Sequence, residues 1–199
     1  MGVRRVVTGH DAGSKAVFTS DSVIETRTVH GIPFEYVPLW SAEQPPVLPD
    51  GGAPPPPGNY YPPLGGLRFG IFTIPPVRET PLTPEERRAV RTQLEAVFPG
   101  LAAHWEVADP GMHTTDSIDF GYVVSGSIWL ELDDGTTKEL RAGDSYVQNG
   151  TRHAWRNRGT APCSILVVMV GTERTPSGLA IAARLREAAR AAKSQKGER

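Results

Sequence analysis

The chain has 199 residues, a formal net charge of −1 and a sequence pI of about 6.5. This balance, without a polybasic cluster, argues against nucleic acid and anionic membranes as partners. The single cysteine excludes an intrachain disulfide, and no apolar run approaches the ~18 residues that a membrane-spanning helix needs. Residues 1–13 contain no apolar signal segment. We therefore expect a soluble cytoplasmic protein.

The first forty residues contain short stretches with the composition of strands. Strands are expected over 4–8 and 16–19, joined by a turn at 10–14, with a further extended piece over 22–29. An apolar and partly alternating stretch follows over 34–40. We expect these strands to extend a sheet of the main fold.

Proline and glycine dominate residues 43–63, which read EQPPVLPDGGAPPPPGNYYPP. Because proline removes a backbone donor and fixes φ, this segment cannot be a helix or a central strand. Two interpretations stay open: a passive surface loop, or an arm or lid that packs through Tyr60 and Tyr61. We expect the segment to be at least partly ordered, near a barrel mouth or across a dimer partner.

A strand over 66–74 precedes the clearest helix, over 83–98. Thr83 is the expected N-cap, Pro84 occupies the first helical position, and Glu86 completes a capping box. Apolar side chains then recur at helical spacing on one face, namely Val90, Leu94, Val97 and Phe98. The helix is therefore expected to cover one side of the main fold.

From residue 107 onward the pattern is all-β. Short, evenly spaced strands are expected over 120–124, 128–132, 137–140, 145–148, 153–157 and 164–170. Gly135 supplies the positive φ that a tight hairpin turn at 133–136 needs. The fold class predicted is all-β, a single antiparallel barrel of two facing sheets.

The chain is thus divided into three parts. Residues 1–106 hold the N-terminal strands, the Pro-rich loop and the first helix, all packed on the barrel. Residues 107–171 form the barrel, and residues 172–199 form a C-terminal helix, expected over 177–192, and a tail.

Three side chains with metal-binding or acid–base chemistry are expected to point into this barrel. His113, Thr115 and Asp119 lie at even offsets and so share one face of an extended chain. His153 follows forty residues after His113, with Trp155 on its own face. Two imidazoles and one carboxylate form a facial set suited to Fe(II) and other first-row ions, with positions left open for substrate.

Two motifs carry a resemblance to a known family. Residues 113–126 read HTTDSIDFGYVVSG, and residues 143–157 read GDSYVQNGTRHAWRN. In this order, joined by a hairpin, they resemble the two motifs of the cupin superfamily over residues 107–171. The resemblance implies a jelly-roll barrel, the double-stranded β-helix. The flanks are similar to single-cupin bacterial and fungal proteins of undefined activity.

The departures from the family pattern concern the metal site. Carried over position by position, the ligands become His113, Thr115, Asp119 and His153, so that a neutral hydroxyl replaces a usual histidine. The shorter Asp119 replaces a glutamate, and water or Asp116 would have to supply a fourth ligand. The resemblance implies a divalent ion, Fe, Mn, Ni or Zn, held by His113, Asp119 and His153. No nucleotide cofactor is expected.

Three functions remain open on these residues. The first is an enzyme that acts on a small organic molecule with a divalent metal, catalysing dioxygenation, decarboxylation, isomerisation or dehydration. The second is a metal-free enzyme of the epimerase, cyclase or dehydratase kind, in which Asp119 orients or charges a histidine as general base. The third is a non-enzymatic ligand-binding module. The catalytic candidates are His113, Asp119 and His153, and the candidate substrate contacts are Thr115, Tyr122, Gln148 and Trp155.

Assembly as a homodimer is also expected. Single cupins commonly pair, and the strand-forming N-terminus has edges that need covering. No nucleic acid and no membrane is expected among the partners.

Overall fold

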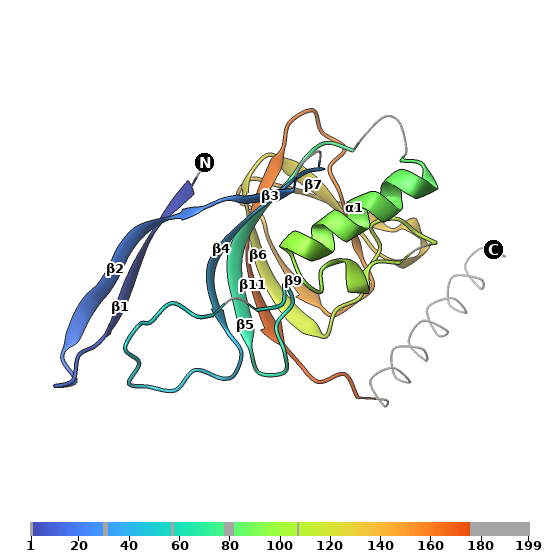
Figure 1. Cartoon of the computed structure of the whole chain (residues 1–199). Coiled ribbons are helices and arrows are strands. Elements are labelled where there is room, and N and C mark those ends of the chain that lie inside the picture. The colour runs from blue at the N-terminus through green and yellow to red at the C-terminus, as the bar shows by residue number, and fades with distance from the viewer. Residues whose placement is uncertain (1, 30–31, 57, 78–81, 107, 176–199) are drawn as a thin grey trace, which may run out of the picture.

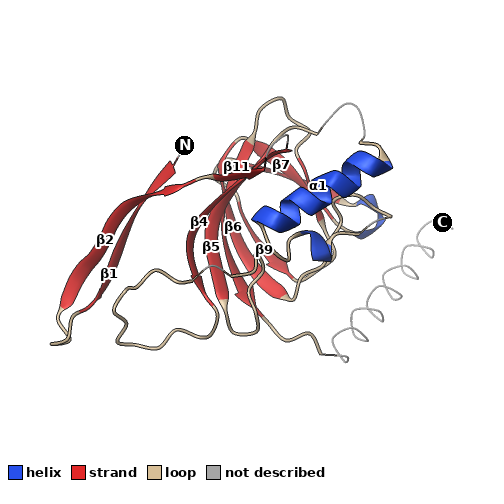
Figure 2. Cartoon of the chain, viewed as in Figure 1, coloured by secondary structure: helices blue, strands red, loops and turns tan. Residues whose placement is uncertain are grey.

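Two facing antiparallel sheets form the body of the protein in the computed structural model, which describes residues 2–29, 32–56, 58–77, 82–106 and 108–175 (Figures 1 and 2). The larger sheet has six strands in the order β3 (Arg27–Val29), β4 (Ile32–Ala42), β5 (Leu67–Ile74), β11 (Cys163–Gly171), β6 (Ser117–Ser125) and β9 (Ser145–Asn149). The smaller has three, in the order β10 (Ala154–Arg156), β7 (Ser127–Glu131) and β8 (Thr137–Arg141). The predicted all-β jelly roll is confirmed.

Strand β11 lies at the centre of the larger sheet and shows why these residues fold this way. It pairs with β5 on one side and β6 on the other. Its sequence CSILVVMVG is apolar almost throughout and alternates between buried and half-buried positions. The buried set, Cys163, Ile165, Val167 and Met169, faces the core. The β-branched residues suit a strand flanked by neighbours on both edges.

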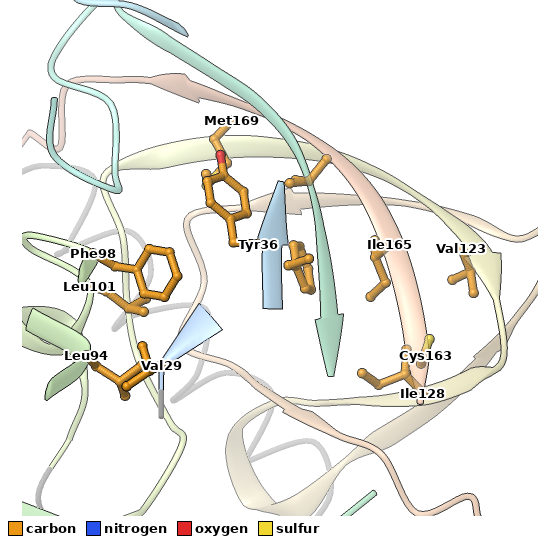
Figure 3. Packing of buried hydrophobic residues seen from close by; sticks show 12 residues of the cluster. Val29, Tyr36, Leu94, Phe98, Leu101, Val123, Ile128, Cys163, Ile165 and Met169 are labelled. Carbon is orange, nitrogen blue, oxygen red and sulfur yellow. The ribbon is translucent and has the colours of Figure 1, made fainter. Parts of the chain in front are cut away.

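The core lies between the sheets and continues under the helix α1 (Pro84–Val97). Figure 3 shows Leu94 and Phe98 beside Val29 and Leu101 at one end, and Val123, Ile128 and Cys163 at the other. These side chains are at most 5% exposed. Burial of this apolar surface is the main term that holds the fold together.

The helix begins as its capping box predicts. Thr83 Oγ1 accepts a hydrogen bond from the Glu86 backbone N–H, and a Glu86 carboxylate oxygen accepts one from the Thr83 N–H. Two unpaired backbone donors at the start of the helix are thereby satisfied, and Pro84 has no N–H to satisfy. Leu94 is only 1% exposed, which confirms the predicted apolar face.

The N-terminal strands are longer than predicted and divide into two groups. Strands β1 (Gly2–His10) and β2 (Ala16–Glu25) pair with each other as a separate two-stranded hairpin that projects from the barrel (Figure 1). The expected extension of the barrel sheet is made by β3 and β4 and not by β1 and β2.

The Pro-rich segment runs from the barrel to the hairpin and back. At its far point, the Asp50 carbonyl accepts a hydrogen bond of 2.8 Å from the His10 N–H. On its return, the Tyr60 N–H donates to the Pro99 carbonyl at 2.7 Å. Tyr60 and Tyr61 pack against the core, as the presence of two aromatic rings suggested.

No helix within the described ranges is long and apolar enough to cross a membrane. The helix expected over 177–192 lies outside the residues that the structure describes.

Candidate functional site

The two predicted histidines form a backbone pair across the barrel. The His113 N–H donates to the His153 carbonyl at 2.9 Å, and the His153 N–H donates to the His113 carbonyl at 3.0 Å. Their rings consequently lie close together, with centroids 4.2 Å apart. Antiparallel pairing is therefore what joins two imidazoles that are forty residues apart in the chain.

Local hydrogen bonds fix the tautomer of both rings. Nδ1 of His113 lies 2.9 Å from the Gly111 carbonyl oxygen, and Nδ1 of His153 lies 2.9 Å from the Thr151 carbonyl oxygen. A carbonyl can only accept, so each Nδ1 carries the proton and each neutral ring keeps a lone pair on Nε2.

Burial keeps both rings neutral. It lowers the pKa of His153 to about 4, with a further lowering from the neighbouring His113. It also lowers the pKa of His113. A water-poor surrounding disfavours the charged imidazolium, so both rings serve as hydrogen-bond acceptors through Nε2 at neutral pH.

Asp119 supplies the carboxylate of the site. It lies on β6, is 8% exposed, and accepts a hydrogen bond of 2.6 Å from the Ser117 hydroxyl. Burial raises the pKa of Asp119 to about 6, against the opposing effect of that hydrogen bond. No lysine, arginine or histidine in the described part of the chain forms an ion pair with it. The carboxylate is thus buried without a compensating cation, which is costly in a structural position.

All three residues line one cavity of about 260 Å³, which we call the aromatic pocket. Its walls also contain seven aromatic side chains, namely Phe34, Tyr60, Tyr61, Phe72, Trp105, Tyr146 and Trp155. No lysine or arginine is among its described lining residues. A cavity with these walls suits a neutral ligand with a flat apolar body.

The four predicted substrate contacts have different outcomes. Trp155 lines the aromatic pocket. Thr115 and Gln148 are buried beside it but do not line it, because their side chains bond within the protein, to Ser117 and Thr151 respectively. The prediction for Tyr122 was wrong.

Tyr122 lies on the outer face of β6 and is 47% exposed. It stands at an odd offset from Asp119, and successive side chains of a strand point to opposite faces. Because Asp119 points inward, Tyr122 points away from the pocket.

Sequence reasoning missed Tyr61 and Tyr146 as pocket residues. The signal for Tyr146 was present, because it precedes the buried Gln148 by two residues on β9 and so shares its face. A glycine opposite makes room for it: a Cβ on Gly121 would overlap the Tyr146 ring. For Tyr61 no periodic signal existed, since it lies in the Pro-rich segment.

The predicted metal ligands do not make a complete donor set. Among the described residues, no three His, Cys, Asp or Glu side chains are placed so that they could hold one ion. His113, Asp119 and His153 share the pocket, and their binding of one ion stays a prediction. The short Asp119 side chain is engaged by Ser117, and Thr115 stands where the family has a second histidine. Asp116, considered as a fourth ligand, pairs with Arg174 at 2.5 Å.

The comparisons with known proteins match the part of the chain that contains the two motifs. The family model described as "Cupin domain" matches residues 102–169. "Phomopsin biosynthesis cluster protein C'" of Diaporthe leptostromiformis is 55% identical over 47 residues, which are 24% of this chain and 25% of that protein. "Cupin-domain-containing oxidoreductase virC" of Hypocrea virens is 37% identical over 62 residues, 30% of this chain and 32% of that protein.

Among solved structures, the Schizosaccharomyces pombe Cnp3 cupin domain is similar over 84% of this chain and 87% of its own, with a TM-score of 0.44 and 10% identity. The match to the first curated relative spans only a quarter of that relative's length. The family match, the two motifs and the paired sheets agree on one conclusion: the chain contains a cupin domain of the jelly-roll type.

Proposed function

We propose that the protein is a small-molecule enzyme that moves protons with its own side chains, with Asp119 as the acid–base residue of the aromatic pocket. The observation that carries the proposal is a carboxylate that is buried, faces no cation and lines a cavity. Charged groups in such surroundings are unfavourable for folding and are characteristic of functional sites.

Asp119 is a stronger base than His153. Its pKa of about 6 makes its carboxylate more basic than an ordinary aspartate, whereas the His153 ring, at about 4, is a weaker base than an ordinary histidine. A general base works best when its pKa lies near the working pH. We therefore assign proton abstraction to Asp119, and hydrogen-bond acceptance to Nε2 of the two histidines.

Tyr61 and Tyr146 complement the base Asp119 as hydrogen-bond donors. Burial raises the pKa of both phenols, and the charge of Asp119 raises them further. Both hydroxyls therefore stay protonated at any working pH and can donate. Within the described residues, neither hydroxyl makes a hydrogen bond to a protein group. They are the groups that would stabilise a negative oxygen on a substrate.

The reaction class that fits is proton transfer at carbon. Asp119 takes a proton from a carbon beside a carbonyl group. The C–H electron pair forms a C=C bond to the carbonyl carbon, and the carbonyl π pair moves to the oxygen, where a tyrosine hydroxyl donates a hydrogen bond. Return of the proton to another carbon or face gives isomerisation or epimerisation, and delivery to a departing hydroxyl gives dehydration. The aromatic walls favour a neutral substrate of one or two rings.

A metal-dependent oxidoreductase is the second candidate. It is supported by two neighbouring imidazoles whose Nε2 atoms carry lone pairs, and by relatives named cupin-domain-containing oxidoreductases. It requires a further ligand from outside the predicted set, so the proton-transfer function is the better supported of the two.

Deuterium exchange tests the proposal. Protein dialysed against a chelator would be incubated in D2O with a panel of aromatic ketones and lactones, and loss of the α-proton signal would be followed by NMR. We expect exchange that increases with pH through about 6, as Asp119 ionises. Asp119→Asn should reduce the rate by roughly 100-fold or more, since it removes the base.

Asp116→Asn is the matched control. It makes the same chemical change three residues away, at an exposed side chain outside the aromatic pocket. It should leave exchange unchanged. Exchange that disappears on chelation and returns with one divalent metal would overturn the proposal in favour of the second candidate, as would an Asp119→Asn variant that remains fully active.

A further inference from the structure

A second cavity, of about 250 Å³, lies outside the barrel. It is bounded by the β1–β2 hairpin, strands β3 to β5, the Pro-rich segment and the end of α1, and we call it the arginine pocket. Figure 1 shows the hairpin and the Pro-rich segment on one side of the barrel. The residues that matter here are Arg5, Arg27, Trp40, Pro54, Arg68 and Phe98.

One of the three arginines has a structural role. Arg68 is 4% exposed, forms an ion pair of 2.8 Å with Glu43, and donates through Nε to the Asn59 carbonyl at 2.8 Å. It holds the return path of the Pro-rich segment against β5. Its charge is balanced, so it adds little to the net charge of the cavity.

The other two arginines are not balanced. Arg5 donates through Nη1 to the Leu39 carbonyl at 2.8 Å and lies over the Trp40 ring, with Cζ 5.1 Å from the ring centroid. Its Nε is buried and has no hydrogen-bond partner. Arg27 is exposed on β3. Neither forms an ion pair in the described part of the chain, and no carboxylate is among the cavity's described lining residues.

Such an arrangement is incomplete without an anion. A buried N–H with no acceptor is unfavourable, and two unpaired guanidinium groups at one cavity repel each other. Guanidinium groups bind carboxylates and phosphates through paired, charge-assisted hydrogen bonds. Trp40, Phe98 and the prolines from Pro54 to Pro56 supply apolar surface for the rest of a ligand.

We propose that the arginine pocket binds a small organic anion, in which a carboxylate or phosphate contacts Arg5 and Arg27 and an attached ring packs against Trp40 and the prolines. The size of the cavity restricts the occupant to a small molecule. This site is separate from the aromatic pocket, and its ligand does not depend on what reaction Asp119 performs.

Calorimetric titration of the full chain tests the proposal. The probes are phenylacetate and phenyl phosphate, which distinguish a carboxylate from a phosphate ligand, and neutral benzyl alcohol. We expect at least one anion to bind with a dissociation constant below ~1 mM. Benzyl alcohol should bind at least tenfold more weakly at this site. Arg5→Gln and Arg27→Gln should each weaken the anion about tenfold or more.

Two controls keep the result interpretable. Arg4→Gln removes the same charge from the neighbouring position of β1, where Arg4 pairs with Asp21 at 2.6 Å outside the cavity, and should not change binding. Asp119→Asn should not change it either, which separates this site from the aromatic pocket. Arg27 is exposed, so Arg27→Gln is expected to fold even if Arg5→Gln does not. The proposal is overturned if neither anion binds up to ~10 mM, or if Arg27→Gln binds as tightly as the unaltered protein.

Discussion

The two cavities of this protein have nearly equal volumes, about 260 and 250 Å³, and opposite chemistry. The aromatic pocket contains a buried carboxylate and no described lysine or arginine. The arginine pocket contains three arginines and no described carboxylate. Tyr60 lines both cavities. We propose that the first takes a neutral ring and the second an anion, although a single side chain contributes to both walls.

The two cavities differ in chemistry because different parts of the fold form their walls. The aromatic pocket takes its polar groups from inward-facing strand positions of the barrel, where burial removes water and moves pKa values away from their ordinary range. The arginine pocket is assembled from a projecting hairpin and a Pro-rich segment, where long charged side chains can keep their heads near solvent. We therefore expect proton transfer in the aromatic pocket and ion pairing with a ligand in the arginine pocket.

The largest expected effect on stability comes from Gly121→Val. A branched side chain here would occupy the space of the Tyr146 ring, which lies on the wall of the aromatic pocket alone. Overpacking of this kind destabilises by ~1–3 kcal/mol. Thermal denaturation should show a clear decrease in Tm, and anion binding in the folded fraction should persist.

Gly51→Ala serves as the control, because an added Cβ there meets no atom within 4 Å. Equal loss of Tm in both variants would contradict the assigned packing of Tyr146.

A pH-dependent effect is expected from Asp119→Asn. The folded-state pKa of about 6 lies above the ordinary value near 4, so folding favours the protonated carboxyl. The stabilisation associated with Asp119 is thus complete below about pH 4 and is lost as pH rises through about 6. The variant should match the natural protein at pH 4 and be more stable at pH 8, by up to ~3 kcal/mol.

Urea denaturation across this pH range measures the difference between the two proteins. His153 acts in the opposite direction, because its lowered pKa removes stability as pH falls from about 6.5 towards 4. Since His153 is present in both proteins, subtraction of the two curves isolates Asp119. A difference that does not vary with pH would contradict a buried, ionisable Asp119.

Substitution at the outer face of the barrel sheet is expected to have the smallest effect on folding stability. Its effect on assembly is expected to be large. Phe120, Tyr122 and Val124 on β6 and Val147 on β9 are 47–57% exposed and form an apolar surface that belongs to neither cavity. We propose that this surface packs against a second copy, whose identical uncharged face would match it.

Tyr122→Glu should then shift the mass measured by light scattering towards monomer, because a carboxylate would be buried at the contact. Phe18→Glu is the control, since Phe18 is 79% exposed on the hairpin β1–β2. If the natural protein is already a monomer at micromolar concentration, the homodimer prediction is wrong.

Most strands and the helix could be predicted from the sequence because their signals are local. The capping box at Thr83 and the positive φ at Gly135 were both observed as expected. Errors arose where spatial neighbours decide. Nothing local distinguishes strands that extend the barrel from the separate β1–β2 hairpin. Tyr122 is a different case, because its odd offset from Asp119 on β6 was a local signal that it points outward.

The sequence by itself determined the cupin fold and brought His113, Asp119, His153 and Trp155 to the barrel interior, because strand periodicity and motif spacing are properties of the chain. Only the tertiary structure decided what those residues can do. It placed Asp119 in a pocket whose described lining holds no lysine or arginine, and it brought Arg5 and Arg27 to one cavity. Burial, electrostatic neighbours and cavity walls depend on segments far apart in the sequence, and these set the pKa values and the ligand preference of each site.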